Sequence, residues 1–356
     1  MGRKAFFLLL YFFAICFSVT LAIFAILASI GPLYKPEYGA FIPLLTLSLP
    51  FLLIANAILL VWWAIRWKRW VWVSLIAIIA NYSFIESMYR FGSEKVAQTQ
   101  GKTINVVTYN VQNFDWQPTL WSLTDIAVFL LDENIDVICF QEYAESESFN
   151  EDSVASVLNF LPYYKIDRNS SEGLSLAIFS KYPISGNGNY RYKSMTKGMW
   201  ADIQVDGKPI RVFNCHLQTT NVNQTRGELE RNLVIDLDAQ TKNAAQKLLN
   251  AAERNFWIRV QQADSIGKLI RQSPYPTIVC GDLNSVPTSY CYWKIRGNLI
   301  DGFKECGSGY GATYRYMKEL YKIDYIFHSK ELKGISYRIN KLDYSDHYPT
   351  VMSLSL

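Results

Sequence analysis

The sequence predicts a protein of two parts, an N-terminal bundle of membrane-spanning helices and then an α/β (α+β) domain in which two packed β-sheets are flanked by helices. Three observations lead to this prediction. Long uncharged stretches lie within residues 1–93. Beyond them, many short strand-like runs alternate with helical segments, a pattern typical of packed sheets covered by helices. Polar residues directly follow several of these runs, where side chains from different strands meet.

Two uncharged stretches at the N-terminus are each long enough to cross a membrane. They run from Ala5 to Ile30 and from Phe41 to Ile65, and a helix needs about 20 apolar residues to cross the hydrocarbon core. A third stretch, Trp70 to Ile85, is shorter and spans only if Tyr89 and Phe91 extend it into the interface. We therefore expect a transmembrane region over residues 1–93, with spans at about 5–30, 41–65 and 70–89.

Basic residues predict the orientation of these spans. Arg3 and Lys4 precede the first span, and Arg66, Lys68 and Arg69 separate the second from the third. Because Lys and Arg are retained on the cytoplasmic side, three crossings place the rest of the chain on the opposite side. We expect an integral protein of a bacterial inner membrane whose large domain is extracytoplasmic (periplasmic). A cleaved signal peptide is the alternative for the first stretch, which is long for one and lacks a convincing small-x-small site after it.

The charge balance of the large domain bears on its partners. Residues 97–356 contain 27 Lys or Arg and 28 Asp or Glu, so this part is close to neutral. Proteins that grip long nucleic acids usually carry a basic surface that displaces counterions. The balance therefore disfavours nucleic acid, although a local basic groove containing Arg191, Lys193 and Lys197 stays open as an alternative.

The order of short apolar runs defines the large domain. Residues 94–103 are polar and predict a linker, and residues 104–356 form one domain. Helices are predicted over 123–132 and 151–160. The long charged segment 219–272 has helical spacing and is interpreted as a crossover between strands, with a lid or membrane-facing element as the alternative. Strands are predicted at 104–109, 137–140, 174–179, 199–205, 210–215, 277–280, 323–327 and 351–354.

Two short strings near the C-terminus carry the chemistry most clearly. Gly281–Asn284 follows the apolar run Thr277–Cys280 and places Asp282 beside an amide, while Ser345–His347 places Asp346 beside an imidazole. The i, i+2 spacing of Asp282 and Asn284 directs both side chains the same way on an extended segment. Hard oxygen ligands suit Mg²⁺ or Mn²⁺, and a neutral His next to them can take a proton from water.

Four further strings place a polar residue in or after an apolar run. They supply Asn110, Glu142, His216 and Asp324. Taken singly, each has an ordinary structural interpretation: an Asn that caps a turn, a surface Glu, or a His satisfied within the core. It is the ordered set that points to function.

The six strings together resemble the endonuclease/exonuclease/phosphatase (deoxyribonuclease I-like) superfamily over residues 104–356. The resemblance implies a four-layer α/β/β/α sandwich and hydrolysis of a phosphoester with Mg²⁺ (or Mn²⁺). It implies metal ligands at Glu142, Asn110, Asp346 and Asp282. It implies phosphate contacts from Asn284, His216 and Asn110. It implies catalytic roles for His347 as general base, Asp324 as its orienting acid, His216, Asp282 and Asn284.

The same resemblance leaves three functional hypotheses. The favoured one is a membrane-anchored phosphodiesterase or phosphatase that uses in-line water attack on a lipid headgroup or small phosphoester, with the lipid bilayer as its partner. The second is a membrane-anchored endo/exonuclease of the deoxyribonuclease I type; it is weakened by the neutral charge and by Gln112, since the apurinic-type nucleases often have an Asp there. The third is an inactive binding module, which a full set of catalytic residue types disfavours.

Overall fold

The computed structural model describes residues 2–37, 39–91, 101–115, 120–145, 150–168, 175–219 and 239–356. Most of the predicted linker, residues 94–100, lies outside these ranges. The chain forms two compact units, each described by itself. The first comprises residues 1–86, 222–257 and 288–290, and the second comprises residues 87–221, 258–287 and 291–356.

Apolar helices make up the N-terminal part of the first unit. They are α1 (Arg3–Ser29), the short 3₁₀ helix η1 (Gly31–Leu33), α2 (Phe41–Ile65), α3 (Val71–Ala80) and α4 (Tyr82–Met88). By length and composition α1 alone qualifies as a straight membrane span. The predicted second and third spans are bent helix pairs, 61° within α2 and 62° between α3 and α4, so the described chain has three spans if each bent pair crosses once.

Both bends have local causes in the sequence. Pro50 lies inside α2, where it removes a backbone donor and clashes with the preceding turn. Between α3 and α4, the chain breaks at Asn81, whose buried amide donates to the carbonyl oxygens of Ala77 and Ala25, both at 2.9 Å. The same amide therefore ends α3 and ties it to α1.

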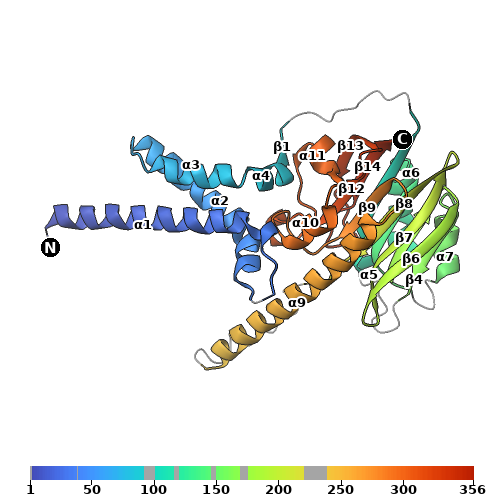
Figure 1. The fold of residues 1–356 in the computed structure, drawn as a ribbon, viewed down its shortest axis with the longest axis horizontal. Coiled ribbons are helices and arrows are strands. Elements are labelled where there is room, and N and C mark those ends of the chain that lie inside the picture. The colour runs from blue at the N-terminus through green and yellow to red at the C-terminus, as the bar shows by residue number, and fades with distance from the viewer. Residues whose placement is uncertain are drawn as a thin grey trace. The chain divides into compact units, whose positions relative to one another are not determined.

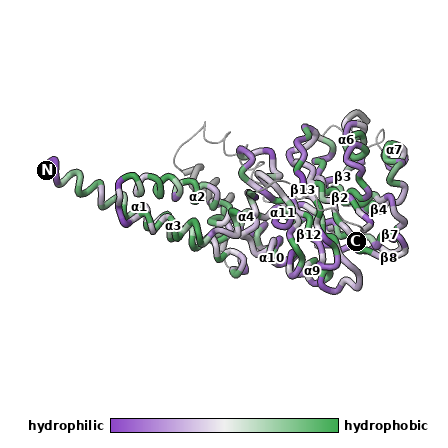
Figure 2. Tube along the Cα trace, turned by 90° about the horizontal axis from the view of Figure 1, so that it is seen from above, coloured by the Kyte–Doolittle hydropathy of each residue, from purple (hydrophilic) through white to green (hydrophobic). Residues whose placement is uncertain are grey.

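The helices of this unit are apolar outside and polar or small inside. Large residues such as Phe12, Ile58 and Ile76 are more than half exposed, and hydrophobic residues follow α1, α2 and α3 along their length (Figure 2). At the contact of the helices, Ser18 is buried and accepts a hydrogen bond from Trp63 Nε1 at 2.9 Å. Small and polar residues at helix contacts with an apolar exterior are typical of helices packed within a lipid bilayer. Further buried small residues are Ala22, Ala25, Ala28, Ser74 and Ala77.

The second unit contains two six-stranded mixed sheets (Figure 1). The first sheet has the order β13-β14-β2-β3-β5-β4, and the second has the order β10-β12-β9-β8-β7-β6. The strands of the first sheet are β2 (Thr103–Asn110), β3 (Val137–Tyr143), β4 (Tyr163–Asp167), β5 (Ser175–Ser180), β13 (Lys333–Ile339) and β14 (Thr350–Ser355). Those of the second are β6 (Ile184–Tyr192), β7 (Met195–Val205), β8 (Lys208–His216), β9 (Thr277–Asp282), β10 (Ile300–Asp301) and β12 (Asp324–His328).

Alternation along each strand builds the layers. In β2, Ile104 and Val106 join the core between the two sheets, whereas Val107 and Tyr109 face the helices on the other side. Those helices are α6 (Leu120–Asp132) and α7 (Glu151–Val157). The second sheet is covered by α10 (Tyr290–Arg296) and by the end of α9 (Ala239–Arg271), where Ile266 lies against Gly198 of β7. The predicted four-layer α/β/β/α sandwich is confirmed. The remaining elements are α5 (Gln112–Asp115), α11 (Gly302–Cys306), η2 (Met317–Glu319) and a separate pair, β1 (Tyr89–Arg90) with β11 (Gly309–Tyr310).

All eight predicted strands are present. Four strands of the two six-stranded sheets were not predicted, nor was the separate pair β1 and β11. The edge strand β6 is an example, because its glycines and asparagines have low strand propensity. Its glycines are required by packing, since a Cβ on Gly188 would lie 2.8 Å from the ring of Trp200. The other strands not predicted are β4, β10 and β13.

The long helix α9 accounts for much of the segment 219–272. It lies in the chain between β8 and β9, which are parallel neighbours in the second sheet. Parallel neighbours require a crossover connection. Over its described residues, α9 is therefore part of the crossover between β8 and β9. Residues 220–238 lie outside the described residues.

One buried cation stands out in the second unit. Lys322 is fully buried, its ammonium lies 3.8 Å from the centre of the Phe303 ring, and the nearest carboxylate in an ion pair is Asp301 at 4.0 Å. Burial lowers the pKa of Lys322 to about 8, with Asp301 opposing the shift. Asp301 is otherwise well bonded, accepting from Tyr292 Oη at 2.6 Å and from the backbone of Phe303 at 2.9 Å.

This lysine predicts a pH dependence of stability. In the unfolded chain Lys322 keeps its proton up to its ordinary pKa of 10.5, so between about pH 8 and that value the unfolded state binds more protons. Stability therefore rises with pH in this window, and below about pH 8 the burial penalty is constant. At pH 7 we expect Lys322→Met to stabilise the protein by about 1–3 kcal/mol, a gain that shrinks as the pH rises to 10. Guanidinium unfolding of the full chain in detergent micelles measures both; a gain that stays constant with pH contradicts the prediction.

Candidate active site

Neighbouring strands of the second sheet place four polar residues in one row. Register pairs His216 of β8 with Asp282 of β9, and Asp282 with Asp324 of β12. On the other side of His216, Lys197 of β7 directly precedes the pair Gly198 and Cys215. The row follows from strand register alone, because residues opposite one another in a sheet lie about 5 Å apart.

The first sheet delivers Asn110 and Glu142 to the same place. Asn110 ends β2 opposite Gln141 of β3, and the pairing of β3 with β5 shifts register between Phe140 and Tyr143. Within this irregularity Glu142 adopts a left-handed backbone, φ 50°. Such a conformation is uncommon for a residue with a long side chain and is concentrated at functional sites.

A buried amide pair joins the two sheets directly behind these residues. Gln141 Nε2 donates to Asn214 Oδ1 at 2.6 Å. The Asn214 amide in turn donates to the carbonyl oxygens of Phe140 at 2.8 Å and Ala177 at 3.0 Å. Asn214 lies in β8 and its partners lie in β3 and β5, so three hydrogen bonds cross between the sheets at the strand ends.

Asp282 is the centre of the resulting cluster. Its Oδ2 accepts hydrogen bonds from the amides of Asn110 at 3.1 Å and Asn284 at 3.0 Å. The same oxygen lies 3.7 Å from Nε2 of both His216 and His347. Asp282 thus touches residues of both sheets while being 1% exposed.

Gly281 is what allows the neighbouring strands to close up at this point. Its φ is +147°, and a Cβ there would lie 2.0 Å from the carbonyl oxygen of Cys215. No other residue fits, since the contact is with backbone rather than a movable side chain. Asn284, two residues after Asp282, is left-handed with φ 47°, and its backbone N–H donates to Asp282 Oδ1 at 2.7 Å.

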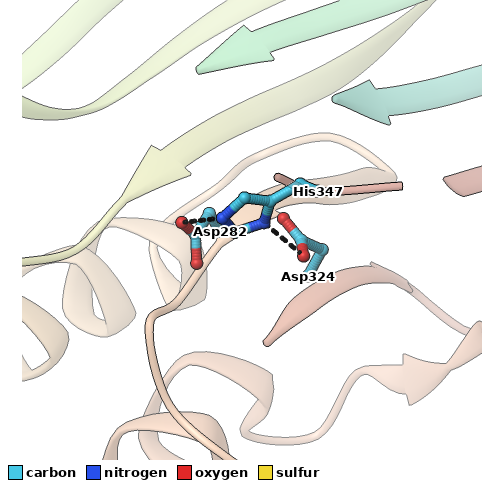
Figure 3. Close-up of side chains that lie close together, drawn as sticks. All are labelled: Asp282, Asp324 and His347. Carbon is cyan, nitrogen blue, oxygen red and sulfur yellow. Dashed lines mark hydrogen bonds and ion pairs between the residues drawn. The ribbon is translucent and has the colours of Figure 1, made fainter. Parts of the chain in front are cut away.

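His347 lies between two carboxylates. Its Nδ1 contacts Asp324 Oδ2 at 2.9 Å, and its Nε2 faces Asp282 (Figure 3). Burial alone would lower the pKa of His347, but Asp324, Asp282 and Asp346 together hold it well above its ordinary value. Because Asp324 occupies Nδ1, the imidazole presents Nε2 to the cluster.

The carboxylates of the cluster are held against their own preference for water. Burial raises the pKa of Asp282 to about 7, with His347 opposing the shift and Asp324 adding to it. Burial likewise raises the pKa values of Glu142 and Asp346, again opposed by His347. Several buried carboxylates that are hard to ionise together favour a bound cation.

His216 behaves differently from His347. Burial first, and then the positive charges of Lys197 and His347, lower the pKa of His216 well below its ordinary value, so the ring is neutral. Its Nε2 lies 3.4 Å from Glu142 Oε1 yet has no hydrogen-bond partner among the described residues. A buried polar atom left in this way points to a group that the cluster binds.

Neighbouring loops hold the cluster through backbone contacts. Ser345 Oγ donates to the carbonyl oxygen of Asn110 at 2.6 Å, and Gln112 Oε1 accepts from the backbone N–H of Asp346 at 3.3 Å. From α9, the buried guanidinium of Arg259 donates to the carbonyl oxygen of Asn284. These bonds fix the loops that carry Asn284, Asp346 and His347.

The structure brings together every residue predicted for the site. Two contributors were not predicted in this role. Lys197 is only 7% exposed and acts electrostatically on Glu142 and His216. In the sequence it lies two residues before a predicted strand, and this position favoured the basic groove over the site. Arg259 lies in a charge-rich helix whose sequence gives no indication of burial.

The candidate basic groove is only partly exposed, and part of its charge is paired. Arg191 pairs with Asp167 at 2.7 Å, and Asp167 also accepts from Thr196 at 3.0 Å. With Lys197 buried in the site, Lys193 alone of the three contributes an uncompensated exposed cation. This arrangement weakens the nuclease alternative.

The donor set fits a hard divalent cation. One ligand atom from each of Asp282, Asp324 and His347 lies within 4.8 Å of the others, and all three residues are buried. Asp324 Oδ2 contacts His347 Nδ1, but Asp324 Oδ1 is buried without a hydrogen-bond partner among the described residues. The carboxylates of Asp282, Glu142 and Asp346 also belong to the cluster. Carboxylate oxygens are the ligands that Mg²⁺ and Mn²⁺ prefer.

Comparisons with known proteins agree with this geometry. Residues 107–347 match the Endonuclease/Exonuclease/phosphatase family, and the chain belongs to this family. Its members cleave phosphoesters, so the protein falls in a class of hydrolases. Residues 5–88 match a separate domain family of unknown function. No curated protein matches the chain.

Solved structures share the fold at low sequence identity. TDP2 from D. rerio in complex with a single-stranded DNA product is 15% identical, with a TM-score of 0.51 over 72% of this chain and 100% of that chain. An endonuclease/exonuclease/phosphatase family protein from Bacteroides thetaiotaomicron is 18% identical, with a TM-score of 0.50 over 72% and 98%. Another from Bacteroides vulgatus is 18% identical, with a TM-score of 0.50 over 72% and 99%. The similarity is one of fold.

The amide pair between the sheets yields a stability prediction. Replacing Asn214 by Leu leaves the buried carbonyl oxygens of Phe140 and Ala177 without this donor and removes the acceptor of Gln141. We expect the free energy of unfolding to fall by about 2–4 kcal/mol. The matched control is Asn250→Ala on an exposed face of α9, expected to change it by less than about 0.5 kcal/mol. Denaturant unfolding of the full chain measures both, and equal effects of the two variants would refute the bridge.

Proposed function

We propose that this protein is a membrane-anchored, divalent-metal-dependent phosphoester hydrolase, a phosphodiesterase or phosphatase that uses in-line attack by water. The observation that carries the proposal is the convergence of Glu142, Asp282 and Asp346 with His216 and His347. Two carboxylates linked through Asn110, beside two imidazoles, form a site for a cation and a phosphoryl group.

Metal binding is assigned to the carboxylates of Glu142, Asp282 and Asp346. Asn110 joins the first two, since its Nδ2 also lies 3.3 Å from Glu142 Oε1; its amide oxygen accepts from the backbone N–H of Gln112 at 3.0 Å. Its own ligation of the ion stays a prediction. When bound, Mg²⁺ or Mn²⁺ offsets negative charge on the phosphoryl oxygens.

The chain's own residues supply the remaining chemistry. His347 is oriented by Asp324, so that Nε2 takes the proton of the attacking water. The neutral His216 presents its unpartnered Nε2 to a phosphoryl oxygen, and the buried charge of Lys197 favours an anion beside it. Asn284 keeps its predicted role as a phosphate contact. A covalent intermediate on Ser345 is disfavoured, because its hydroxyl is bonded to the backbone of Asn110.

The metal-hydrolase assignment is tested on a soluble diester. We expect purified full-length protein to hydrolyse bis-p-nitrophenyl phosphate with Mg²⁺ or Mn²⁺ and to lose this activity on chelation. His347→Ala and Glu142→Gln each lower kcat about 10³-fold or more, and Asp324→Asn about 10²-fold or more, because the acid fixes the histidine tautomer. Activity that resists chelation or survives His347→Ala would defeat the proposal, and Tyr163→Ser on β4 is the control for handling and folding.

We further propose that residues 1–93 form three spans that anchor residues 104–356 on the extracytoplasmic (periplasmic) side of a bacterial inner membrane. The proposal is supported by the apolar exterior of α1, α2 and α3 and by the basic residues between the second and third stretches. The segment 94–103 is assigned as the linker.

Reporter fusions test this orientation. We expect alkaline phosphatase fused after Gln100 to be active and a fluorescent protein fused there to be dark, because only the former folds outside the cytoplasm. Fusions after Lys68 should show the opposite behaviour. A fluorescent reporter after Gln100 with an inactive phosphatase would mean that the third stretch does not cross, and the catalytic domain would then be cytoplasmic.

A further inference from the structure

We propose that exposed aromatic residues beside the catalytic cluster form a surface that docks into the membrane interface, so that the substrate is a phospholipid reached from the bilayer. The residues are Tyr89, Phe91, Tyr310, Tyr316 and Met317, here named the aromatic patch. Their exposed fractions are 42%, 88%, 47%, 55% and 41% respectively. The inference rests on the proposed function and specifies its substrate class.

The patch is continuous through contacts within the second unit. The rings of Tyr89 and Phe91 lie 4.8 Å apart, and Tyr89 pairs with Tyr310 across β1 and β11. Tyr310 Oη donates to the carbonyl oxygen of Glu319 at 2.5 Å. The backbone N–H of Glu319 donates to the carbonyl oxygen of Tyr316 at 3.2 Å. Segments distant in sequence thus present their large side chains together.

The patch also reaches the catalytic cluster. Tyr316 contacts the ring of Tyr314 with centroids 5.9 Å apart, and Tyr314 contacts His347 with centroids 5.3 Å apart. Tyr314 and His347 also form a backbone bridge. The exposed aromatic surface therefore leads directly to the residue assigned as general base.

The loop that carries Tyr316 and Met317 is held in an unfavourable conformation. Met317, Lys318 and Glu319 all have positive φ, between 54° and 59°. Glu319 anchors the loop, accepting from Lys341 Nζ at 2.8 Å and from Tyr348 Oη at 2.9 Å. Backbone strain held by such contacts is found at functional sites, and here it keeps a Met and a Tyr in solvent instead of letting them fold back.

The position of the patch in the chain indicates its partner. Tyr89 directly follows α4, which ends at Met88 and forms with α3 a bent pair apolar enough to cross a membrane. At about 3.3 Å per residue, the chain from Met88 places Tyr89 and Phe91 within about 10 Å of the helix end. This distance is similar to the thickness of the interfacial layer of a bilayer. Tyr and Phe favour this layer, and the exposed cation Lys318 beside Met317 suits its anionic phosphates.

Spin labels test docking independently of activity. In a Cys16→Ser background, Phe91→Cys and Met317→Cys are labelled and the full chain is placed in nanodiscs of phosphatidylethanolamine and phosphatidylglycerol (3:1). Tyr163→Cys on β4 is the control, and the other cysteines are buried. We expect the ratio of oxygen to nickel-chelate collisions to be about fivefold higher at 91 and 317 than at 163, as for residues in an apolar interface. Equal ratios at all three positions would overturn the docking surface. So would single-stranded DNA that shields the labels at 91 and 317 from the nickel chelate in the absence of lipid.

Hydrolysis of two esters tests the substrate class. The double variant Phe91→Ser/Met317→Asn should hydrolyse phosphatidylglycerol in the nanodisc about tenfold more slowly. It should hydrolyse bis-p-nitrophenyl phosphate within about twofold of the parent, because it leaves the contacts from Tyr316 through Tyr314 to His347 in place. Tyr163→Ser should change neither rate. An unchanged rate on the lipid, or an equal loss on both esters, overturns the inference. A parent protein inert on the soluble ester contradicts the proposed function instead, and the spin labels still decide whether the patch docks.

Discussion

The site depends on the buried amide pair of Gln141 and Asn214. Its hydrogen bonds join β3 and β8 across the interior, one residue before Glu142 and two before His216. Two packed sheets otherwise slide on an apolar interface, because dispersion contacts have little directionality. Directed hydrogen bonds in a water-free core are costly to break, so they set the separation at which carboxylates from one sheet meet imidazoles from the other.

The polar cluster that this constraint assembles is electrostatically unfavourable by itself. Asp282 is buried and Glu142 and Asp346 are half-buried, and all three have raised pKa values, while His347 and Lys197 face them. Proteins accept such a local cost at sites of binding and catalysis. Backbone strain adds to this unfavourable energy, since Glu142 and Asn284 are left-handed and the strands approach closely at Gly281. A rigid four-layer sandwich with an extensive apolar core holds these residues in place.

The N-terminal helices differ from the sandwich in which side chains they bury and which they expose. Polar and small side chains such as Ser18 and Asn81 lie inside, and many large apolar side chains lie outside. In the sandwich, valines and isoleucines fill the two apolar cores. The sequence of the N-terminal helices therefore suits a lipid environment, and that of the sandwich suits water. The aromatic patch begins at Tyr89, where the chain passes from the first part to the second. If the patch docks as proposed, the same membrane that anchors the helices supplies the phospholipid substrate.

Sequence by itself determined the chemistry-bearing residues and the class of fold. Short apolar runs identified eight strands. The ordered polar strings in or after these runs, with their resemblance to a known family, identified the predicted members of the cluster. Weakly patterned edge strands such as β6 were not predicted, since glycine and asparagine carry little strand preference. Tertiary structure alone decided what depends on distant pairing. It placed Lys197 in the site, buried Arg259 beneath Asn284, and shifted the pKa values of His216 and His347 in opposite directions. Register, burial and neighbouring charge are properties of the assembled sheets and not of any local stretch.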